Sequence, residues 1–255
     1  MNGNRSLATG DALVLERVSR RFGALAAIDD VSISVRAGER RAVIGANGAG
    51  KTTLFNCITG DFPPTSGRVR FFGDDVTDMP PYERIRAGLR RTYQSSLLFR
   101  DLSARDNLFL AVRGVSRGRY SFLRPRRAST TRAAADELLE RVRLTRVANQ
   151  PVASLAHGQQ RQLEIGMALA GAPRLILFDE PAAGLSPAER VDLMHLFAAL
   201  PAHIGFVLIE HDLEIALKAV ERVTVMHDGR VLKHGTPAEI EDDPEVQAIY
   251  MGRKH

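Results

Sequence analysis

The chain has 255 residues, of which 44% are hydrophobic and 25% charged, with a net charge of +5 and a pI of about 9.8. This balance is that of a globular protein with a core large enough to need no disulfide staples. No stretch approaches the ~18 consecutive apolar residues of a membrane span, so we expect a chain that does not cross a membrane itself.

The N-terminal segment and the cysteine content indicate a cytoplasmic protein. Residues 1–10 are polar and lack the apolar stretch of a signal peptide, so we expect a short disordered lead-in. The single cysteine, Cys57, cannot form an internal disulfide, which favours a reducing compartment, and we expect it to be a buried, inert side chain.

The first half of the chain predicts alternating strands and helices. Apolar and polar residues alternate at 31–35, which is strand period. A short apolar run at 42–44 predicts a second strand, and it leads through a glycine-rich loop into helical spacing at 54–58. A turn cluster precedes a predicted strand at 68–72, and Pro80-Pro81 predicts the start of a short helix.

The strand signals fade from about residue 97 to 153, where apolar residues from 135 to 142 form one helical stripe. We interpret this stretch as a helical lobe inserted into an α/β core. The continuous apolar runs at 175–178 and 205–209 predict strands buried on both faces, separated by a helix at 187–200. Such alternation predicts a parallel sheet covered on both faces.

The strongest motif lies between the predicted strand at 42–44 and the following helix, where the sequence fits G-x-x-x-x-G-K-[ST]. Glycines let successive backbone N–H groups point into one concavity that holds phosphate. Lys51 would reach the β- and γ-phosphates, and the Thr52 hydroxyl would bind Mg²⁺. A tight glycine turn with an exposed lysine is the alternative. The predicted phosphate-binding residues are Gly45, Ala46, Asn47, Gly48, Ala49, Gly50, Lys51, Thr52 and Thr53.

Two adjacent carboxylates follow the apolar run at 175–178. Ligands of open α/β sheets collect at the carboxyl ends of the strands, so Asp179 and Glu180 are expected at the phosphate site. Asp179 suits a magnesium shell, and Glu180 suits a general base or a water-positioning group. An acidic pair that merely ends a strand is the alternative.

A third motif identifies a family. Residues 155–159, Leu-Ala-His-Gly-Gln, lie about twenty residues before Asp179 and resemble the signature motif of ABC ATPases. In that family the motif contacts ATP held by the opposite subunit, and this implies the same role for Leu155, Ala156, His157, Gly158 and Gln159. The resemblance implies a P-loop NTPase (RecA-like) core with a small antiparallel β part and an inserted helical subdomain.

Further family positions match in the expected order. Gln94 resembles the Q-loop glutamine, which the family uses to contact Mg²⁺ and the attacking water, and His211 resembles the switch histidine that contacts the γ-phosphate. Phe22 resembles the aromatic residue that stacks on adenine, with plain core packing as the alternative. The resemblance thus implies catalytic roles for Glu180, His211 and Gln94, and a magnesium shell of Thr52, Gln94 and Asp179.

The resemblance implies one ABC ATPase domain at 11–255. We expect a core at about 11–96 and 158–240, a helical subdomain at about 97–157, and a C-terminal helical tail at 241–255.

Segments 55–60, 158–165, 179–187 and 249–252 are most similar to the subgroup that imports branched-chain amino acids. This implies ATP and Mg²⁺ as cofactors and two membrane permease subunits as partners. It also implies a second ATPase subunit, an indirect link to a solute-binding protein, no nucleic acid, and a peripheral place on the cytoplasmic face of the membrane.

The signature segment departs from the usual L-S-G-G-Q. Ala156 lacks the serine hydroxyl, a loss of about 0.5–3 kcal/mol where that hydrogen bond is made. His157 replaces a glycine, and Ser186 stands where the family usually has aspartate in the D-loop. We therefore hypothesise a heterodimer with a second ATPase subunit and two unequal ATP sites, although a homodimer stays an alternative.

Two rival functions and one segment stay open. An export ATPase, such as one for lipopolysaccharide, shares this fold and chemistry, whereas a soluble ABC ATPase acting on nucleic acid or ribosomes usually carries long coiled-coil insertions. Residues 113–127 hold six arginines with interleaved aromatics. They suit a solvated insertion, contact with anionic lipid headgroups, or nucleic-acid binding, in that order of preference.

Overall fold

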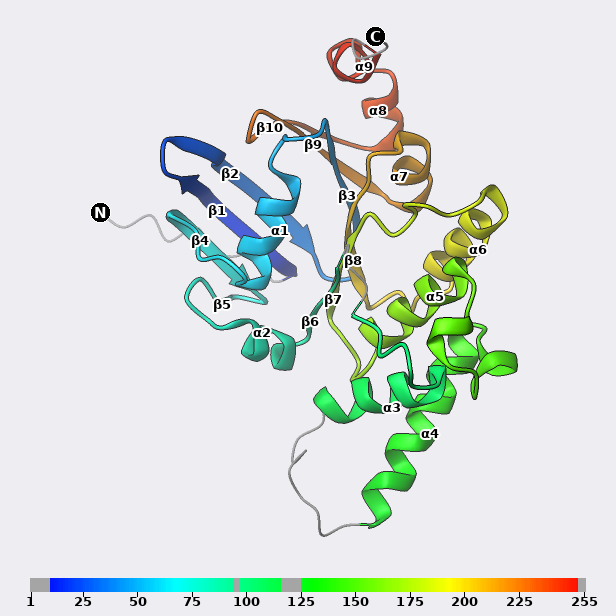
Figure 1. The fold of residues 1–255 in the computed structure, drawn as a ribbon. Coiled ribbons are helices and arrows are strands. Elements are labelled where there is room, and N and C mark those ends of the chain that lie inside the picture. The colour runs from blue at the N-terminus through cyan, green and yellow to red at the C-terminus, as the bar shows by residue number, and fades with distance from the viewer. Residues whose placement is uncertain (1–9, 94–96, 116–124, 252–255) are drawn as a thin grey trace.

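The computed structural model describes residues 10–93, 97–115 and 125–251, which form two β-sheets and a set of helices (Figure 1). The lead-in predicted at 1–10 lies, apart from Gly10, outside these residues. Gln94 and most of the arginine-rich segment 113–127 lie outside them as well, so the hypotheses on both stay predictions.

The smaller sheet is antiparallel, with the strand order β2-β1-β4-β5. The larger sheet has the order β10-β9-β3-β8-β7-β6 and is parallel except at its β10 edge. The small sheet consists of β1 (Asp11–Phe22), β2 (Leu25–Arg36), β4 (Ser66–Phe71) and β5 (Asp74–Asp75). The large sheet consists of β3 (Arg40–Gly45), β6 (Leu89–Thr92), β7 (Leu175–Asp179), β8 (Gly205–Ile209), β9 (Arg222–His227) and β10 (Arg230–Gly235).

The helices alternate with the parallel strands, except for a run of helical segments between β6 and β7. That run comprises α3 (Ala104–Val115), α4 (Pro125–Arg141), η1 (Thr145–Val147), η2 (Val152–Ser154) and α5 (His157–Ala168). The other helices are α1 (Lys51–Thr59), α2 (Pro81–Ala87), α6 (Pro187–Ala198), α7 (Leu213–Ala219), α8 (Pro237–Glu241) and α9 (Pro244–Met251). None of the helices in the described ranges is both long and apolar enough to cross a membrane.

The two faces of the parallel sheet belong to different apolar clusters, because successive strand residues point to opposite sides. Leu175 and Leu177 of β7 join α1 and the antiparallel sheet in one cluster. Ile176 and Phe178 of the same strand join α5 and α6 in the other. The prediction of a parallel sheet covered on both faces is therefore confirmed.

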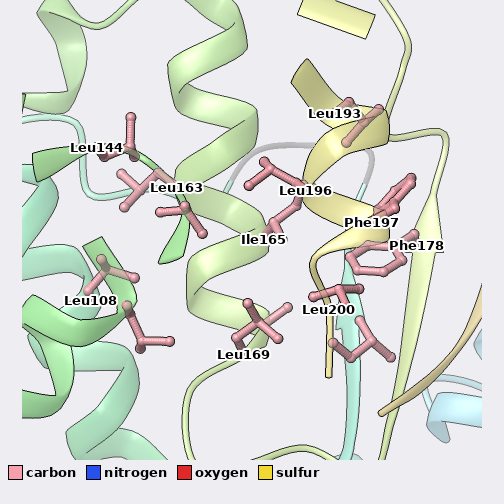
Figure 2. Packing of buried hydrophobic residues seen from close by; sticks show 14 of the residues in the cluster. Leu108, Leu144, Leu163, Ile165, Leu169, Phe178, Leu193, Leu196, Phe197 and Leu200 are labelled. Carbon is pink, nitrogen blue, oxygen red and sulfur yellow. The ribbon is translucent and has the colours of Figure 1, made fainter. Parts of the chain in front are cut away.

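Helix α5 joins the helical segments to the sheet through one continuous cluster. Figure 2 shows Leu163 on the side of α5 that faces Leu108 of α3, and Ile165 toward Leu196 of α6. The rings of Phe197, on α6, and Phe178, on β7, lie 5.0 Å apart. The predicted stripe at 135–142 is buried in this cluster, with Ala135 and Val142 both fully buried.

Two element ends differ slightly from the predicted ones. The strand predicted at 68–72 ends at Phe71, because Phe72 has a φ of 48°, which β structure does not tolerate. The helix predicted at 187–200 ends at Ala198, and the following residues form the turn that returns the chain to β8.

Candidate active site

The phosphate loop joins β3 to α1, and its lysine donates hydrogen bonds to carbonyl oxygens of the same loop. Lys51 Nζ donates to the carbonyl oxygens of Gly45, at 2.7 Å, and Ala46, at 3.0 Å. The side chain is buried, whereas Thr52 is exposed at the start of the helix. Gly50 precedes α1 with a φ of 94°, and a Cβ there would lie 2.5 Å from the carbonyl oxygen of Ala27. Only glycine fits this position.

The far end of α1 is fixed by a buried arginine from α2. Arg84 is 1% exposed, and its Nη1 donates to the carbonyl oxygens of Cys57, at 2.9 Å, and Ile58, at 2.7 Å. Its Nε donates to Met79 O and its Nη2 to Thr77 O, both at 2.8 Å. A cation at this end complements the unsatisfied carbonyls and the helix dipole.

Cys57 behaves as the sequence predicts. It is fully buried on α1, and this burial raises the pKa of its thiol to about 11. The thiolate that reacts with electrophiles is therefore scarce at neutral pH.

A cavity of about 650 Å³ lies over the phosphate loop. Besides loop residues 47–53, its lining contains Phe22, Glu180 and two segments that sequence analysis missed. These are the start of β2, at Leu25–Ala27, and the turn between β9 and β10, at Asp228–Gly229. The order of the strands in the two sheets brings both segments to the site, and strand order leaves no local signal in the sequence.

Phe22 borders this cavity with 42% of its surface exposed. The edge of its ring meets Phe62, with centroids 5.8 Å apart at 83°, and the guanidinium of Arg20 lies 4.8 Å from its centroid. An aromatic ring with this much exposure is not plain core packing, which weakens that alternative.

Asp179 ends β7 inside the protein and is ion-paired. Its Oδ2 accepts a hydrogen bond from Arg91 Nη2 at 2.7 Å, and the two side chains are only 4% and 5% exposed. Its backbone N–H points to Thr92 Oγ1 at 3.4 Å. Sequence analysis missed this pairing, because β6 and β7 are far apart along the chain.

Glu180 follows β7 in a strained backbone conformation and reaches the cavity. Its φ is 48°, which costs a non-glycine residue of order 1 kcal/mol or more and is common at functional sites. Its N–H donates to Ile209 O at 2.9 Å, which holds the turn against β8. His211 Nδ1 lies 3.9 Å from Glu180 Oε2. The structure thus brings Glu180 and His211 together beside the phosphate loop.

Glu210 is a functional candidate that sequence analysis missed. The side chain is fully buried, and its Oε1 accepts the N–H of Ala182 at 2.9 Å. Its Oε2 receives no hydrogen bond from the described residues, and His211 Nδ1 lies 3.9 Å away. Burial raises the pKa of Glu210. Its place directly after the apolar run at 205–209 puts it at the carboxyl edge of the sheet, but nothing in the local sequence marks its side chain as buried.

The signature segment begins α5 and lies outside the cavity lining found among the described residues. Ala156 and His157 are exposed, while the Gly158 N–H donates to Glu189 Oε1 at 2.8 Å. The second oxygen of Glu189 accepts the Ser186 N–H at 2.8 Å, so Ser186 begins α6 in a reciprocal cap. Hydrogen bonds from Ser186 and then Gly158 lower the pKa of Glu189.

A second hollow, of about 220 Å³, opens between α2, β6 and the helical segments. We call it the lateral groove. Its lining is mainly apolar, and Leu97 is 65% exposed there. The groove is lined by Ile85, Arg90, Arg91, Thr92, Tyr93, Leu97, Leu98, Ala111, Val115, Glu164, Met167 and Ala168.

The oxygen donors at the site fit a metal that arrives with phosphate. Within the described residues, no group of three or more His, Cys, Asp or Glu side chains could hold a metal ion unaided. The Thr52 hydroxyl lines the cavity and the Asp179 carboxylate ends β7, and both offer oxygen ligands. Mg²⁺ is commonly held by one or two protein oxygens together with substrate phosphates.

Comparison with known proteins gives consistent findings. The family model described as ABC transporter matches residues 28–183. The high-affinity branched-chain amino acid transport ATP-binding protein BraF of Pseudomonas aeruginosa is 37% identical, over 94% of this chain and 97% of its own. LivG of Escherichia coli, described in the same words, is 37% identical over 91% and 94%. The lipopolysaccharide export system ATP-binding protein LptB of Acidithiobacillus ferridurans is 35% identical over 88% and 90%.

Solved structures agree with these relatives. A nucleotide-free ATP-binding cassette from an ABC transporter superposes with a TM-score of 0.83 at 32% identity, covering 94% of this chain and 98% of the other. A dimeric post-hydrolysis state of an ATP-binding cassette bound to ADP and Pi gives a TM-score of 0.75 at 26% identity, covering 88% and 98%.

Proposed function

The chain belongs to the ABC transporter family of ATP-binding proteins and is an ATPase that energises a transporter. From this premise we propose that it energises an importer of branched-chain amino acids or related small polar solutes. The similarity to BraF and LivG covers nearly the full length of this chain and of each relative, and it is the observation that carries the proposal.

We propose the following division of work at the ATP site. The N–H groups of residues 45–53 and the start of α1 hold the phosphates, and Lys51 turns from its carbonyls to the β- and γ-phosphates. Glu180 positions or deprotonates the attacking water, and His211, which lies beside it, contacts the γ-phosphate. Phe22 stacks on adenine at the outer end of the cavity.

Mg²⁺ is the second cofactor of the proposal, held by Thr52 and Asp179 and, as the family resemblance implies, by Gln94. When bound, it neutralises charge on the β- and γ-phosphates during transfer. The oxygen chemistry of these side chains fits such an ion.

The signature residues Leu155, Ala156, His157, Gly158 and Gln159 are proposed to contact ATP held by another subunit. Their place outside the cavity of their own chain supports this, as does a dimeric solved relative. Because Ala156 lacks a hydroxyl, we propose a heterodimer with a second ATPase subunit whose two ATP sites are unequal. Full transporter-rate hydrolysis by a homodimer of the purified chain would contradict this.

The subunits of this family work with membrane permease subunits. We propose that two permease subunits each seat a cytoplasmic helix on an ATPase subunit, in the lateral groove here. Its exposed apolar side chains support this, since patches of this kind mark interaction sites. The chain would then lie on the cytoplasmic face of the membrane, linked to a solute-binding protein only through the permeases. The proposed moving parts are the core at 11–96 and 158–240 and the helical subdomain at 97–157, with 241–255 as a tail.

Lipopolysaccharide or lipid export is the second candidate, because LptB is 35% identical. The ATPase does not contact the cargo, so import and export differ in the permease partner. No observation favours the third candidate, a soluble ABC ATPase acting on nucleic acid or ribosomes.

Purification of the chain from its native membranes in mild detergent tests the proposal. We expect two permease subunits, a second ATPase subunit and an amino-acid-type solute-binding protein to copurify. Membrane subunits of a lipid exporter, or ribosomes and DNA without membrane proteins, would contradict the importer. In the same complex, Glu180→Gln should slow hydrolysis about 100-fold or more while leaving ATP binding intact.

A further inference from the structure

Arg91 occupies a position that links the ATP site to the lateral groove. It lies on β6, and its Nη2 donates to Asp179 Oδ2 at 2.7 Å. Its Nη1 donates to Asn56 Oδ1 on α1 at 2.5 Å and to Asp61 Oδ2, in the turn after that helix, at 3.2 Å. One guanidinium therefore serves two carboxylates that approach from different elements.

The guanidinium is held in a slot rather than on the surface. It lies over the rings of Phe55, at 5.6 Å, and Tyr93, at 4.8 Å, and the Arg91 side chain is 5% exposed. Its Nε finds no hydrogen-bond partner among the described residues. Cation–π contacts with both rings hold the guanidinium beside its carboxylate acceptors.

The two carboxylates differ in their surroundings. Asp179 is 4% exposed, whereas Asp61 is 29% exposed and also accepts a hydrogen bond from Thr59 Oγ1 at 2.7 Å. A cation is attracted more strongly to the buried carboxylate, where the effective dielectric constant is lower. Without a competing cation, the shorter contact is accordingly the one with Asp179.

The same side chain forms part of the lateral groove. Arg91 and Tyr93 both line it, next to Leu97. Burial, followed by the nearby carboxylate of Asp61, raises the pKa of Tyr93. A movement of Arg91 toward Asp61 would alter the wall of the lateral groove that Tyr93 and Arg91 share.

We propose that Arg91 is a positioning residue whose guanidinium leaves Asp179 for Asp61 when a divalent cation is bound at Asp179, and so reports metal occupancy to the lateral groove. The inference rests on the proposed assignment of Asp179 to the magnesium shell. A cation at Asp179 repels Arg91 and competes for the same oxygen, while Asp61 offers an acceptor already within reach. Arg91 and the metal therefore oppose each other at Asp179.

Nucleotide binding with and without metal measures this opposition. The purified full chain is titrated with a fluorescent ATP analogue in excess Mg²⁺ and in chelator, and the ratio of the two affinities is the metal enhancement. Arg91→Gln removes the competing charge and should raise the enhancement roughly tenfold. Asp61→Asn removes the alternative acceptor and should lower it severalfold. Arg91→Lys keeps the charge and should stay near wild type.

A reporter in the groove separates signalling from simple binding. Because the Cys57 thiol is buried with its pKa raised to about 11, a fluorophore attached through Leu97→Cys labels one site. Its emission should change between Mg²⁺ and chelator, with the ATP analogue present, in the otherwise wild-type chain. With Arg91→Gln the change should vanish, although metal binds more tightly. A purely structural role for Arg91 would not produce this split.

The outcomes are distinguishable. If the wild type shows no metal enhancement, and Asp179→Asn gives the same result, the proposed metal site is overturned and the inference with it. A normal enhancement in the wild type that is unchanged in both Arg91→Gln and Asp61→Asn would overturn the inference alone, as would a groove signal that survives in Arg91→Gln. If circular dichroism shows that Arg91→Gln does not fold, Asp61→Asn decides, since Asp61 is partly exposed.

Discussion

The phosphate loop and the signature segment are both helix starts rich in small residues, yet they are built differently. Gly50 is confined by the backbone oxygen of Ala27, and Lys51 is buried under its own loop. Gly158, in contrast, is held by the flexible carboxylate of Glu189, and Ala156 beside it is exposed. Backbone contacts tolerate no substitution, whereas side-chain contacts adapt. The two departures from the family pattern within the signature segment, Ala156 and His157, both fall at exposed positions.

The largest effect should come from the buried lysine. Lys51→Ala should weaken ATP binding about 100-fold or more, because we propose that the residue supplies the charge that faces the β- and γ-phosphates. Equilibrium binding of a fluorescent ATP analogue measures this. Lys218→Ala is the matched control, since Lys218 is exposed and pairs with Glu214 in the preceding turn of α7. Equal affinities of the two variants would contradict the role of Lys51.

Alanine substitutions at Gly50 and Gly158 test the contrast between the two helix starts most directly. Gly50→Ala places a methyl group 2.5 Å from a backbone oxygen at positive φ, so we expect a loss of about 2–3 kcal/mol in the free energy of unfolding. Gly158→Ala meets the end of the Glu189 side chain, which can turn away, so we expect a loss of about 1 kcal/mol or less. Urea unfolding measures both. A larger loss for Gly158→Ala would reverse our account.

Restoring a hydroxyl to the signature segment tests whether its exposed positions accept a change without loss of the fold. Ala156→Ser adds a donor at an exposed position without a steric obstacle, so the fold should be unchanged. In the assembled transporter, steady-state ATPase activity should rise roughly two- to tenfold, the value of one hydrogen bond. Unchanged activity would mean that His157 already supplies the missing contact.

The smallest effect concerns Glu210, the buried carboxylate that directly follows β8. Its pKa is raised by burial above the ordinary 4.5, so the folded protein binds its proton more tightly than the unfolded chain. This contribution to stability is complete below pH 4.5 and is lost as the pH rises through the raised pKa. Glu210→Gln should flatten that decline while keeping the acceptor for Ala182. Parallel stability curves for wild type and variant, from urea unfolding at several pH values, would contradict this.

The comparison also shows what the sequence could and could not predict. The apolar run before Asp179 and the loop before Lys51 are local patterns, so the parallel strands and the phosphate loop were predicted in place. The contacts of Asp179 with Arg91, and of Gly158 with Glu189, join segments far apart along the chain. They depend on strand order and on helix packing, which periodicity alone leaves open. Glu210 was missed because burial of a carboxylate has no local signature.

Arg84 has a consequence for the chain before it is assembled. Its guanidinium complements the carbonyl end of α1 permanently, while the opposite end awaits phosphates. Both ends of the helix dipole therefore face complementary charge only when nucleotide is bound. A ligand that binds the folded protein and not the unfolded chain stabilises the fold, and this stabilisation grows with the logarithm of the ligand concentration. We expect ATP to act as a folding ligand for newly made copies. A cell depleted of ATP would then lose unassembled subunits to proteolysis as well as losing transport.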